Sequence, residues 1–317
     1  MTMLKKIKEQ LHNHHCHQDE FHQAVLEVFE DVKDFYAQHD VYDTYNIAAR
    51  MVEPDLIVNF RVSWENDKGD VEVNRGWRVQ FNNALGAYKG GLRFHPSVNE
   101  SILKFLGFEQ CFKNALTGLP MGGGKGGADF NPKGRSDREI MRFCQAYMQE
   151  LYHYIGPNVD VPAGDINVGA REIGYLFGHY LKLEKLFHGV ITGKGIDFGG
   201  SCGRTEATGY GCIYFLEEML KAHDEGLKGK SVIISGAGNV ALHAAEKAIC
   251  EGAKVLCLSD SKGLLHFKDG LSYEDLQEIK KIKVARHGAL KDFDGAGEYS
   301  DGAEPWDIKA DIALPCA

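Results

Sequence analysis

The sequence lacks long apolar runs, an excess of positive charge and cysteine pairs at metal-binding spacing. No segment approaches the ~20 apolar residues that a membrane-spanning helix needs, and the polar amino terminus lacks the apolar core of a secretory signal. Acidic side chains number 45 against 36 basic ones, a formal net charge of -9, so neither nucleic acid nor an anionic membrane is expected as a partner. These absences predict a soluble, cytoplasmic protein.

The eight cysteines are scattered along the chain, without a Cys-x-x-Cys motif. This pattern is typical of reduced thiols in the cytoplasm, and we expect no disulfides. Residues 12–22 contain five histidines and one cysteine, side chains that are able to bind metal. Because no carboxylate or second cluster at ligand spacing completes a site, we interpret them as the solvated start of a helix and predict no metal.

A chain of 317 residues, 44% of them hydrophobic, is long enough to form two domains with separate cores. In its first half, apolar spacing predicts an amphipathic helix, period-two patterns predict two strands joined by a turn, and S-x-x-E capping boxes at Ser97 and Ser136 predict two further helices. The expected ranges are 20–50 for the first helix, 56–63 and 71–83 for the strands, and about 98–116 and 137–154 for the capped helices.

The rhythm changes after a glycine-rich connection at residues 193–203. The expected elements are then a helix over about 206–224, strands at 231–235 and 254–259 with a glycine turn and helix between them, and a further strand at 313–317. This alternation is typical of a parallel, doubly wound sheet. We therefore predict an α/β protein with a substrate and assembly domain over residues 1–200 and a Rossmann-type nucleotide-binding domain over residues 201–317.

The second domain contains the hexapeptide Gly236-Ala237-Gly238-Asn239-Val240-Ala241, which fits G-x-G-x-x-A between a strand and a helix. The first glycine permits a tight turn, the second lets the backbone approach a pyrophosphate, and the small third position lets the helix pack on the strand. The helix N-terminus adds free amides and the positive end of a dipole. We therefore predict a dinucleotide site that includes Gly236, Gly238, Asn239 and Val240.

Asp260 ends the next strand, at about the distance expected of the residue that contacts the adenine ribose. On its own Asp260 favours a free 2'-hydroxyl and hence NAD, whereas Ser261, Lys262, Lys283 and Arg286 are able to supply donors and positive charge to the 2'-phosphate of NADP. The sequence leaves both cofactors open, and the basic neighbours favour NADP.

Five glycines surround Lys125 in residues 122–127. We interpret their missing side chains as room for a substrate to approach the amine. The segment lacks the signature of a phosphate-binding loop, because Lys125 is followed by glycine rather than by Ser or Thr. If Lys89 and Lys113 converge on this position, burial and like charge would lower the pKa of Lys125 and allow it to exchange protons during turnover.

Four segments closely resemble the hexameric glutamate dehydrogenases of the Glu/Leu/Phe/Val dehydrogenase family: KGGLRFHP at residues 89–96, FEQCFKN at 108–114, GGGKGG at 122–127 and DVPAGD at 160–165. Residues 198–201 and 204–211 extend the resemblance into the second domain, so that it covers nearly the whole chain. The resemblance implies a homo-hexamer that converts L-glutamate reversibly to 2-oxoglutarate and ammonia with NADP or NAD, in a cleft between the domains.

Carried over position by position, the resemblance implies that Lys89 pairs with the side-chain carboxylate of the substrate. Gln110, Lys113 and the backbone near Gly164 would hold its α-carboxylate end.

The resemblance also implies a catalytic pair, in which Lys125 moves protons while water adds to the imine and Asp165 serves the amine that leaves as ammonia. Thr208 and Asn239 match positions that contact the dinucleotide. For Thr208, a structural role at the start of its helix is the alternative.

The chain departs from the family pattern at Thr205, where proline is usual, and at Asn167, where a small residue is usual, and we expect neither change to abolish function. Family members continue well past Ala317, so the predicted Rossmann domain is truncated, and a non-catalytic fragment or assembly partner is one alternative. Another is a leucine, valine or phenylalanine dehydrogenase. Lys89 argues against it, because an ammonium facing an apolar substrate is unfavourable.

Overall fold

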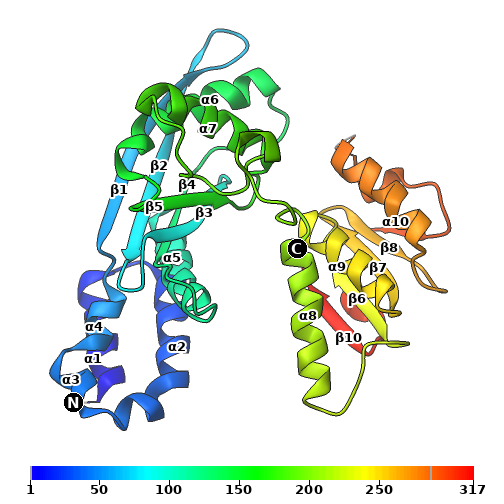
Figure 1. Ribbon diagram of the computed structural model, residues 1–317, viewed down its shortest axis with the longest axis horizontal. Coiled ribbons are helices and arrows are strands. Elements are labelled where there is room, and N and C mark those ends of the chain that lie inside the picture. Colours follow the sequence, from blue (N-terminus) through cyan, green and yellow to red (C-terminus); the bar gives the residue numbers. More distant parts are fainter. Residues whose placement is uncertain (1, 286–287) are drawn as a thin grey trace. The chain divides into compact units, whose positions relative to one another are not determined.

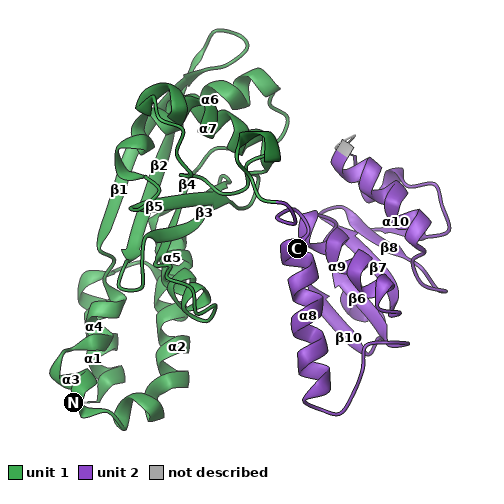
Figure 2. Cartoon of the chain, in the orientation of Figure 1, with its two compact units in different colours: residues 1–201 green, residues 202–317 purple. Residues whose placement is uncertain are grey.

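The computed structural model describes residues 2–285 and 288–317, and the chain forms two compact units, Met1–Ser201 and Cys202–Ala317 (Figure 1, Figure 2). Each unit has its own sheet and its own buried apolar residues. Within the described residues, no helix combines the length and the apolar character that crossing a bilayer requires.

The first unit is built on a sheet with the strand order β1-β2-β4-β3-β5. Its strands are β1 (Leu56–Glu65), β2 (Val71–Asn82), β3 (Tyr88–Phe94), β4 (Gly123–Ala128) and β5 (Asp160–Gly164). β1 and β2 form the predicted antiparallel hairpin, and the side chain of Asn66 closes its turn by accepting from the amides of Lys68 and Asp70. β4, β3 and β5 run parallel, so their carboxyl ends meet at one edge of the sheet.

Helices cover both faces of this sheet. They are α1 (Met3–His14), α2 (Asp19–Ala37), α3 (Asp40–Thr44), α4 (Ile47–Val52), α5 (Glu100–Ala115), α6 (Asp137–Leu151) and α7 (Ala170–Glu184), with short 3-10 turns η1 (Tyr152–Tyr154) and η2 (Ile196–Phe198). On one face α2 and α5 share a core with Val79 and Phe81. On the other, α6 and α7 pack around Leu92 and Phe94.

Residues 20–50 do not form the single helix predicted. α2 ends at Ala37, and two short helices follow, with Asn46 between them in the left-handed conformation at φ 50°. Asparagine adopts this conformation more readily than most residues. The apolar spacing carries no signal for such a break.

The capping box predicted at Ser136 is confirmed, because its hydroxyl accepts from the Glu139 amide and the Glu139 carboxylate accepts from the Ser136 amide. The box predicted at Ser97 is wrong. Asn99 caps α5 instead, its Oδ1 accepting from the amide of Ile102 at 2.9 Å. Asparagine and serine are equally good N-caps, so the sequence contained two equivalent caps two residues apart.

His15, in the histidine-rich segment at residues 12–22, is buried rather than solvated as predicted. Its ring lies 2.6 Å from Nζ of Lys104 and 3.0 Å from Oε1 of Glu53, which ties the N-terminal helices to α5. Among the described residues, no group of His, Cys, Asp and Glu side chains is arranged to hold a metal ion.

The sheet of the second unit has the order β10-β6-β7-β8-β9. Its strands are β6 (Ser231–Ser235), β7 (Lys254–Asp260), β8 (Gly263–His266), β9 (Glu298–Asp301) and β10 (Ile312–Pro315), and its helical segments are α8 (Ala207–Lys221), α9 (Asn239–Cys250), α10 (Tyr273–Lys280), η3 (Lys281–Ala285), η4 (Leu290–Asp292) and η5 (Pro305–Asp307). β10, β6 and β7 run parallel as predicted. β8 and β9 extend the sheet in antiparallel fashion, which the sequence did not predict.

Small residues let α8 pack closely against α9. A Cβ atom at Gly209 would lie 2.6 Å from both the Ala244 nitrogen and the Val240 oxygen, so only glycine fits there. Ala241, the third small position of the predicted motif, is fully buried. This packing fixes the amino end of α9 beside the glycine turn that precedes it.

Candidate functional site

The strand that carries Lys125 is buried along its whole length. Its glycines are closed off by protein atoms: a Cβ at Gly123 would lie 2.2 Å from Sγ of Cys111, and one at Gly126 would lie 2.8 Å from the Leu92 side chain. The interpretation of these two glycines as room for a substrate is therefore wrong. They allow α5 and β3 to pack directly on β4, which buries Lys125 to 5% exposure.

Lys125 and Asp165 come together across β3, the strand between β4 and β5. Nζ of Lys125 on β4 lies 3.2 Å from Oδ1 of Asp165, which follows β5. Gly91 on the intervening strand β3 makes this contact feasible, because a Cβ there would lie only 2.8 Å from Cβ of Asp165. At Gly91 the missing side chain does create space, and the side chain of Asp165 occupies it.

The environment of Lys125 perturbs its protonation. Burial is the largest cause and lowers the pKa of Lys125, the nearby charge of Asp165 opposes that effect, and the positive charges of Arg93 and Lys113 add to it. The predicted direction of the shift is confirmed, with Lys113 as one of its causes. A lysine with a lowered pKa is suited to exchanging protons near neutral pH.

Asp165 contacts a second cation, Arg93, which was not a predicted site residue. Nε of Arg93 donates to Oδ2 of Asp165 at 2.7 Å. Burial raises the pKa of Asp165, but the charges of Lys125 and Arg93 together with this hydrogen bond outweigh burial and leave the pKa below its usual value. Asp165 is therefore held as a carboxylate between two cations.

Lys89 donates from Nζ to Oγ1 of Thr192 at 2.9 Å. Thr192 was not a predicted site residue, and no local pattern marks it, because its partner lies 103 positions earlier in the chain.

Gly164, which was predicted to contact the substrate through its backbone, cannot carry a side chain, since a Cβ there would lie 2.3 Å from the carbonyl oxygen of Val168.

Of the predicted residues of α5, Gln110 is connected to this site through Asn114. Gln110 donates to Oδ1 of Asn114 at 2.8 Å, and Asn114 donates to the carbonyl oxygen of Lys89 at 3.1 Å. Lys113 is exposed on the same helix. The buried Asn114 thus joins α5 to β3, a role that the sequence analysis missed.

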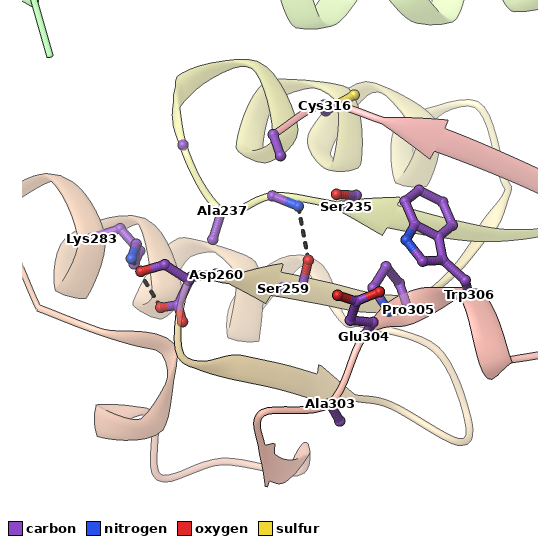
Figure 3. Close-up of a pocket in the computed structure, with 14 residues that line it drawn as sticks. Ser235, Ala237, Ser259, Asp260, Lys283, Ala303, Glu304, Pro305, Trp306 and Cys316 are labelled. Carbon is purple, nitrogen blue, oxygen red and sulfur yellow. Dashed lines mark hydrogen bonds and ion pairs between the residues drawn. The ribbon is translucent and has the colours of Figure 1, made fainter. Parts of the chain in front are cut away.

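In the second unit, a pocket of about 490 Å³ opens at the carboxyl ends of β6, β7 and β10 (Figure 3). Four predicted cofactor residues line it: Gly236, Gly238, Asp260 and Ser261. Gly236 has φ 110°, a conformation that strongly favours glycine, and its amide donates to Ser259 Oγ at 3.0 Å. At Gly238 a Cβ would meet no atom within 4 Å, so the backbone there is open to a ligand.

Asp260 is engaged by neighbours at the edge of this pocket. Its Oδ2 accepts from the Leu290 amide at 2.9 Å. It also lies 3.2 Å from Nζ of Lys283 (Figure 3). Burial alone raises the pKa of Asp260, but the backbone hydrogen bonds from Leu290 and Lys262, with the contribution of Lys283, leave it lowered. Arg286, another of the predicted basic neighbours, lies outside the described residues. Glu304 and Trp306 also line the pocket and were not predicted.

Three predicted cofactor residues are not among the described residues that line this pocket: Thr208, Asn239 and Val240. Thr208 is exposed in the first turn of α8. Asn239 begins α9 and donates to the carbonyl oxygen of Thr205 at 2.7 Å, so its side chain joins the starts of α8 and α9.

Both halves of the chain match known protein families. Residues 54–182 match the family described as Glu/Leu/Phe/Val dehydrogenase, dimerisation domain, and residues 199–317 match the Glutamate/Leucine/Phenylalanine/Valine dehydrogenase family. An NADP-specific glutamate dehydrogenase of Psychrobacter sp. is 56% identical over 99% of this chain and 70% of its own length. An NAD-specific glutamate dehydrogenase of Bacteroides fragilis is 53% identical over 99% and 71%. The crystal structure of Plasmodium falciparum glutamate dehydrogenase matches with a TM-score of 0.95 at 47% identity, covering 99% of this chain and 68% of that one.

Proposed function

This chain belongs to the Glu/Leu/Phe/Val dehydrogenase family, and we propose that it is a glutamate dehydrogenase, which converts L-glutamate and water to 2-oxoglutarate and ammonia while NADP is reduced. The relatives named as glutamate dehydrogenases support this reaction. Within the site, the observation that carries the choice of substrate is the half-buried ammonium of Lys89 beside the Thr192 hydroxyl. These two groups suit a side-chain carboxylate, whereas the alkyl group of leucine would desolvate the ammonium without compensation.

The Lys125 and Asp165 pair is proposed to carry the proton transfers. The nicotinamide, when bound, accepts the hydride that leaves Cα. As water then adds to the imine carbon, its O–H bond breaks and the proton passes to Nζ of Lys125, whose lowered pKa allows it to be neutral at that point. Asp165 supplies the proton that it took from the α-ammonium when glutamate bound: as the C–N bond breaks, this proton passes to nitrogen, which leaves as ammonia. The hydroxyl O–H bond breaks as the carbonyl forms, and its proton is released to solvent.

The remaining substrate contacts are proposed on the resemblance and on their position. Gln110 and Lys113 lie on α5, and Gly164 ends β5. A lysine charge, an amide donor and a backbone group are a suitable set for an α-carboxylate.

The residues at the carboxyl ends of β6 and β7 are proposed to hold the dinucleotide. The turn at Gly236 and the open backbone of Gly238 suit a pyrophosphate at the start of α9, and Asp260 with Ser261 suits the adenine ribose. Lys283 supports NADP for two reasons. Its ammonium offsets the negative charge of Asp260, which would otherwise repel a 2'-phosphate, and it is a donor to such a phosphate. The same pocket with an uncompensated Asp260 would favour NAD, the alternative cofactor.

The assignment of Thr208, Asn239 and Val240 to the dinucleotide is supported by the resemblance alone. Each lies in the first turn of α8 or α9.

We also propose a homo-hexamer located in the cytoplasm. The match of residues 54–182 to a dimerisation domain supports assembly, and all eight cysteines, each within the described residues, are free thiols, as in a reducing compartment. Light scattering of the purified protein would give six times the subunit mass, and a monomer mass would contradict the proposal. Cell fractionation would test the location.

Initial rates of the purified protein with glutamate or leucine, and with NADP or NAD, test the function. We expect turnover of glutamate with NADP, and little turnover of leucine with either cofactor. A folded protein that oxidises leucine and not glutamate would place it among the sister dehydrogenases, and one that oxidises neither would overturn the proposed reaction.

A further inference from the structure

Arg93 gives Asp165 a second cation, and the two cations divide its oxygens between them. Nε of Arg93 donates to Oδ2 at 2.7 Å, whereas Nζ of Lys125 lies 3.2 Å from Oδ1. Both side chains of the Arg93 pair are largely buried, at 19% and 24% exposure. The resemblance that assigns roles to Lys125 and Asp165 assigns none to Arg93.

The backbone on either side of Arg93 is locked to the backbone on either side of Asp165. Leu92 pairs with Gly164 in the parallel register of β3 and β5, and the Phe94 amide donates to the Ile166 carbonyl at 3.1 Å. Asn167, at φ 58°, then donates from its side chain to the Phe94 carbonyl at 2.9 Å. Because these bonds bracket both residues, the contact between Arg93 and Asp165 forms on a rigid frame, as a preorganised site requires.

We propose, on the basis of the proposed function, that Arg93 is a positioning residue that holds Oδ2 of Asp165. Only Oδ1 then exchanges its contact with Lys125 for a contact with the amino group of the substrate. When the α-ammonium of glutamate binds, Oδ1 takes one of its protons. An N–H bond breaks, an O–H bond forms, and the electron pair stays on nitrogen, with no oxidation or reduction. The same proton returns to nitrogen as ammonia leaves.

Arg93 also shifts the pKa values of Asp165 and Lys125. Its charge and hydrogen bond lower the pKa of Asp165 against the opposing effect of burial, and its charge adds to burial in lowering the pKa of Lys125. The other charged groups that act on Lys125 are Lys113 and Glu109, both from α5. Removing the charge of Arg93 therefore raises the pKa of Asp165 and that of Lys125. Both changes move the pH profile of activity to higher pH.

The test compares the pH profiles of kcat and kcat/KM for glutamate oxidation in Arg93→Gln, Arg93→Lys and a control. The control is Arg135→Gln, which removes another arginine that is paired with carboxylates in the same unit, Glu72 and Glu139, away from the site. We expect Arg93→Gln to lower kcat about 10- to 100-fold, to leave the KM for glutamate within a few-fold, and to move the acidic limb of kcat/KM to higher pH. Arg93→Lys, which keeps the charge but not the planar donor, should keep the position of the limb while lowering kcat.

Folding of each variant is checked by thermal denaturation, and wild-type turnover is measured first. Absence of wild-type glutamate oxidation would count against the proposed function, whereas wild-type turnover with an unshifted Arg93→Gln profile and an unchanged kcat would overturn the role of Arg93 alone. If Arg93→Gln does not fold, Arg93→Lys decides: an unchanged kcat there also overturns the proposal, and a reduced kcat with an unmoved limb supports it.

Discussion

Arg78 and Asp160 form an ion pair with no exposed side-chain surface, between β2 and the start of β5. Nε of Arg78 donates to Oδ2 of Asp160 at 2.8 Å, and Nη1 donates to the carbonyl oxygen of Gly90 at 3.1 Å. Gln80 gives Asp160 a further hydrogen bond at 3.1 Å. The pair therefore joins β2 to β5 across the two strands between them, and Arg78 also bonds the β3 residue that follows Lys89.

Breaking this pair should destabilise the first unit strongly. Arg78→Met leaves the carboxylate of Asp160 buried without its charged partner, a change that costs about 3–5 kcal/mol. Scanning calorimetry should show a much lower unfolding temperature for this variant. Arg75→Met, on the same strand, removes a mostly exposed arginine that is paired with Asp129 and should cost much less. Equal losses in the two variants would contradict the importance of the buried pair.

Lys125→Arg tests whether the site lysine must lose its proton. An arginine keeps the positive charge beside Asp165 but does not deprotonate in proteins, so we expect kcat for glutamate oxidation to fall by about 10²- to 10⁴-fold. The wild-type enzyme should gain activity with rising pH below the ordinary pKa of a lysine, because burial lowers the pKa of Lys125. Lys68→Arg, in the exposed hairpin turn, is the control. A variant of Lys125 with normal kcat would exclude proton exchange at Nζ.

Lys89→Leu should change substrate preference through the side-chain pocket. Without the ammonium, the carboxylate of glutamate loses a charged hydrogen bond and kcat/KM should fall by about 10- to 100-fold or more. The oxidation of leucine should improve at the same time, because the alkyl group no longer meets a charge. Thr192→Val keeps the ammonium and removes only the hydroxyl, so its effect on glutamate should be smaller. Unaltered preference in Lys89→Leu would remove Lys89 from the pocket.

The sequence predicted elements well where the signal is local. The capping box at Ser136, the hairpin turn at Asn66 and the strands on either side of the glycine turn at Gly236 all depend on neighbours within a few positions. The prediction failed at Ser97 because Asn99 caps the helix equally well. It also missed the antiparallel strands after Asp260, since the alternation of strands and helices suggested only parallel ones.

The site was harder to predict, because its contacts join distant parts of the chain. Arg93 and Asp165 are 72 positions apart, and Lys89 and Thr192 are 103 positions apart. Only the register of β3 against β5 places Arg93 next to Asp165, and a single sequence does not reveal that register. The glycines around Lys125 show the same limit. Their abundance was evident, but the protein atoms that fill the space at Gly123 and Gly126 come from α5 and β3.

We predict that Lys283 favours NADP over NAD, and the neighbouring Lys281 provides a matched control. Lys283 lies 3.2 Å from Asp260 beside the pocket, whereas Lys281 is exposed and pairs with Glu278 on the same helical segment. Lys283→Ala should raise the KM for NADP by about 10- to 100-fold, because a charge-assisted hydrogen bond to the 2'-phosphate is lost. The KM for NAD should change little or fall, since Asp260 is then available to the ribose hydroxyls. Lys281→Ala should leave both values unchanged, and equal effects of Lys283→Ala on the two cofactors would assign the discrimination to other residues.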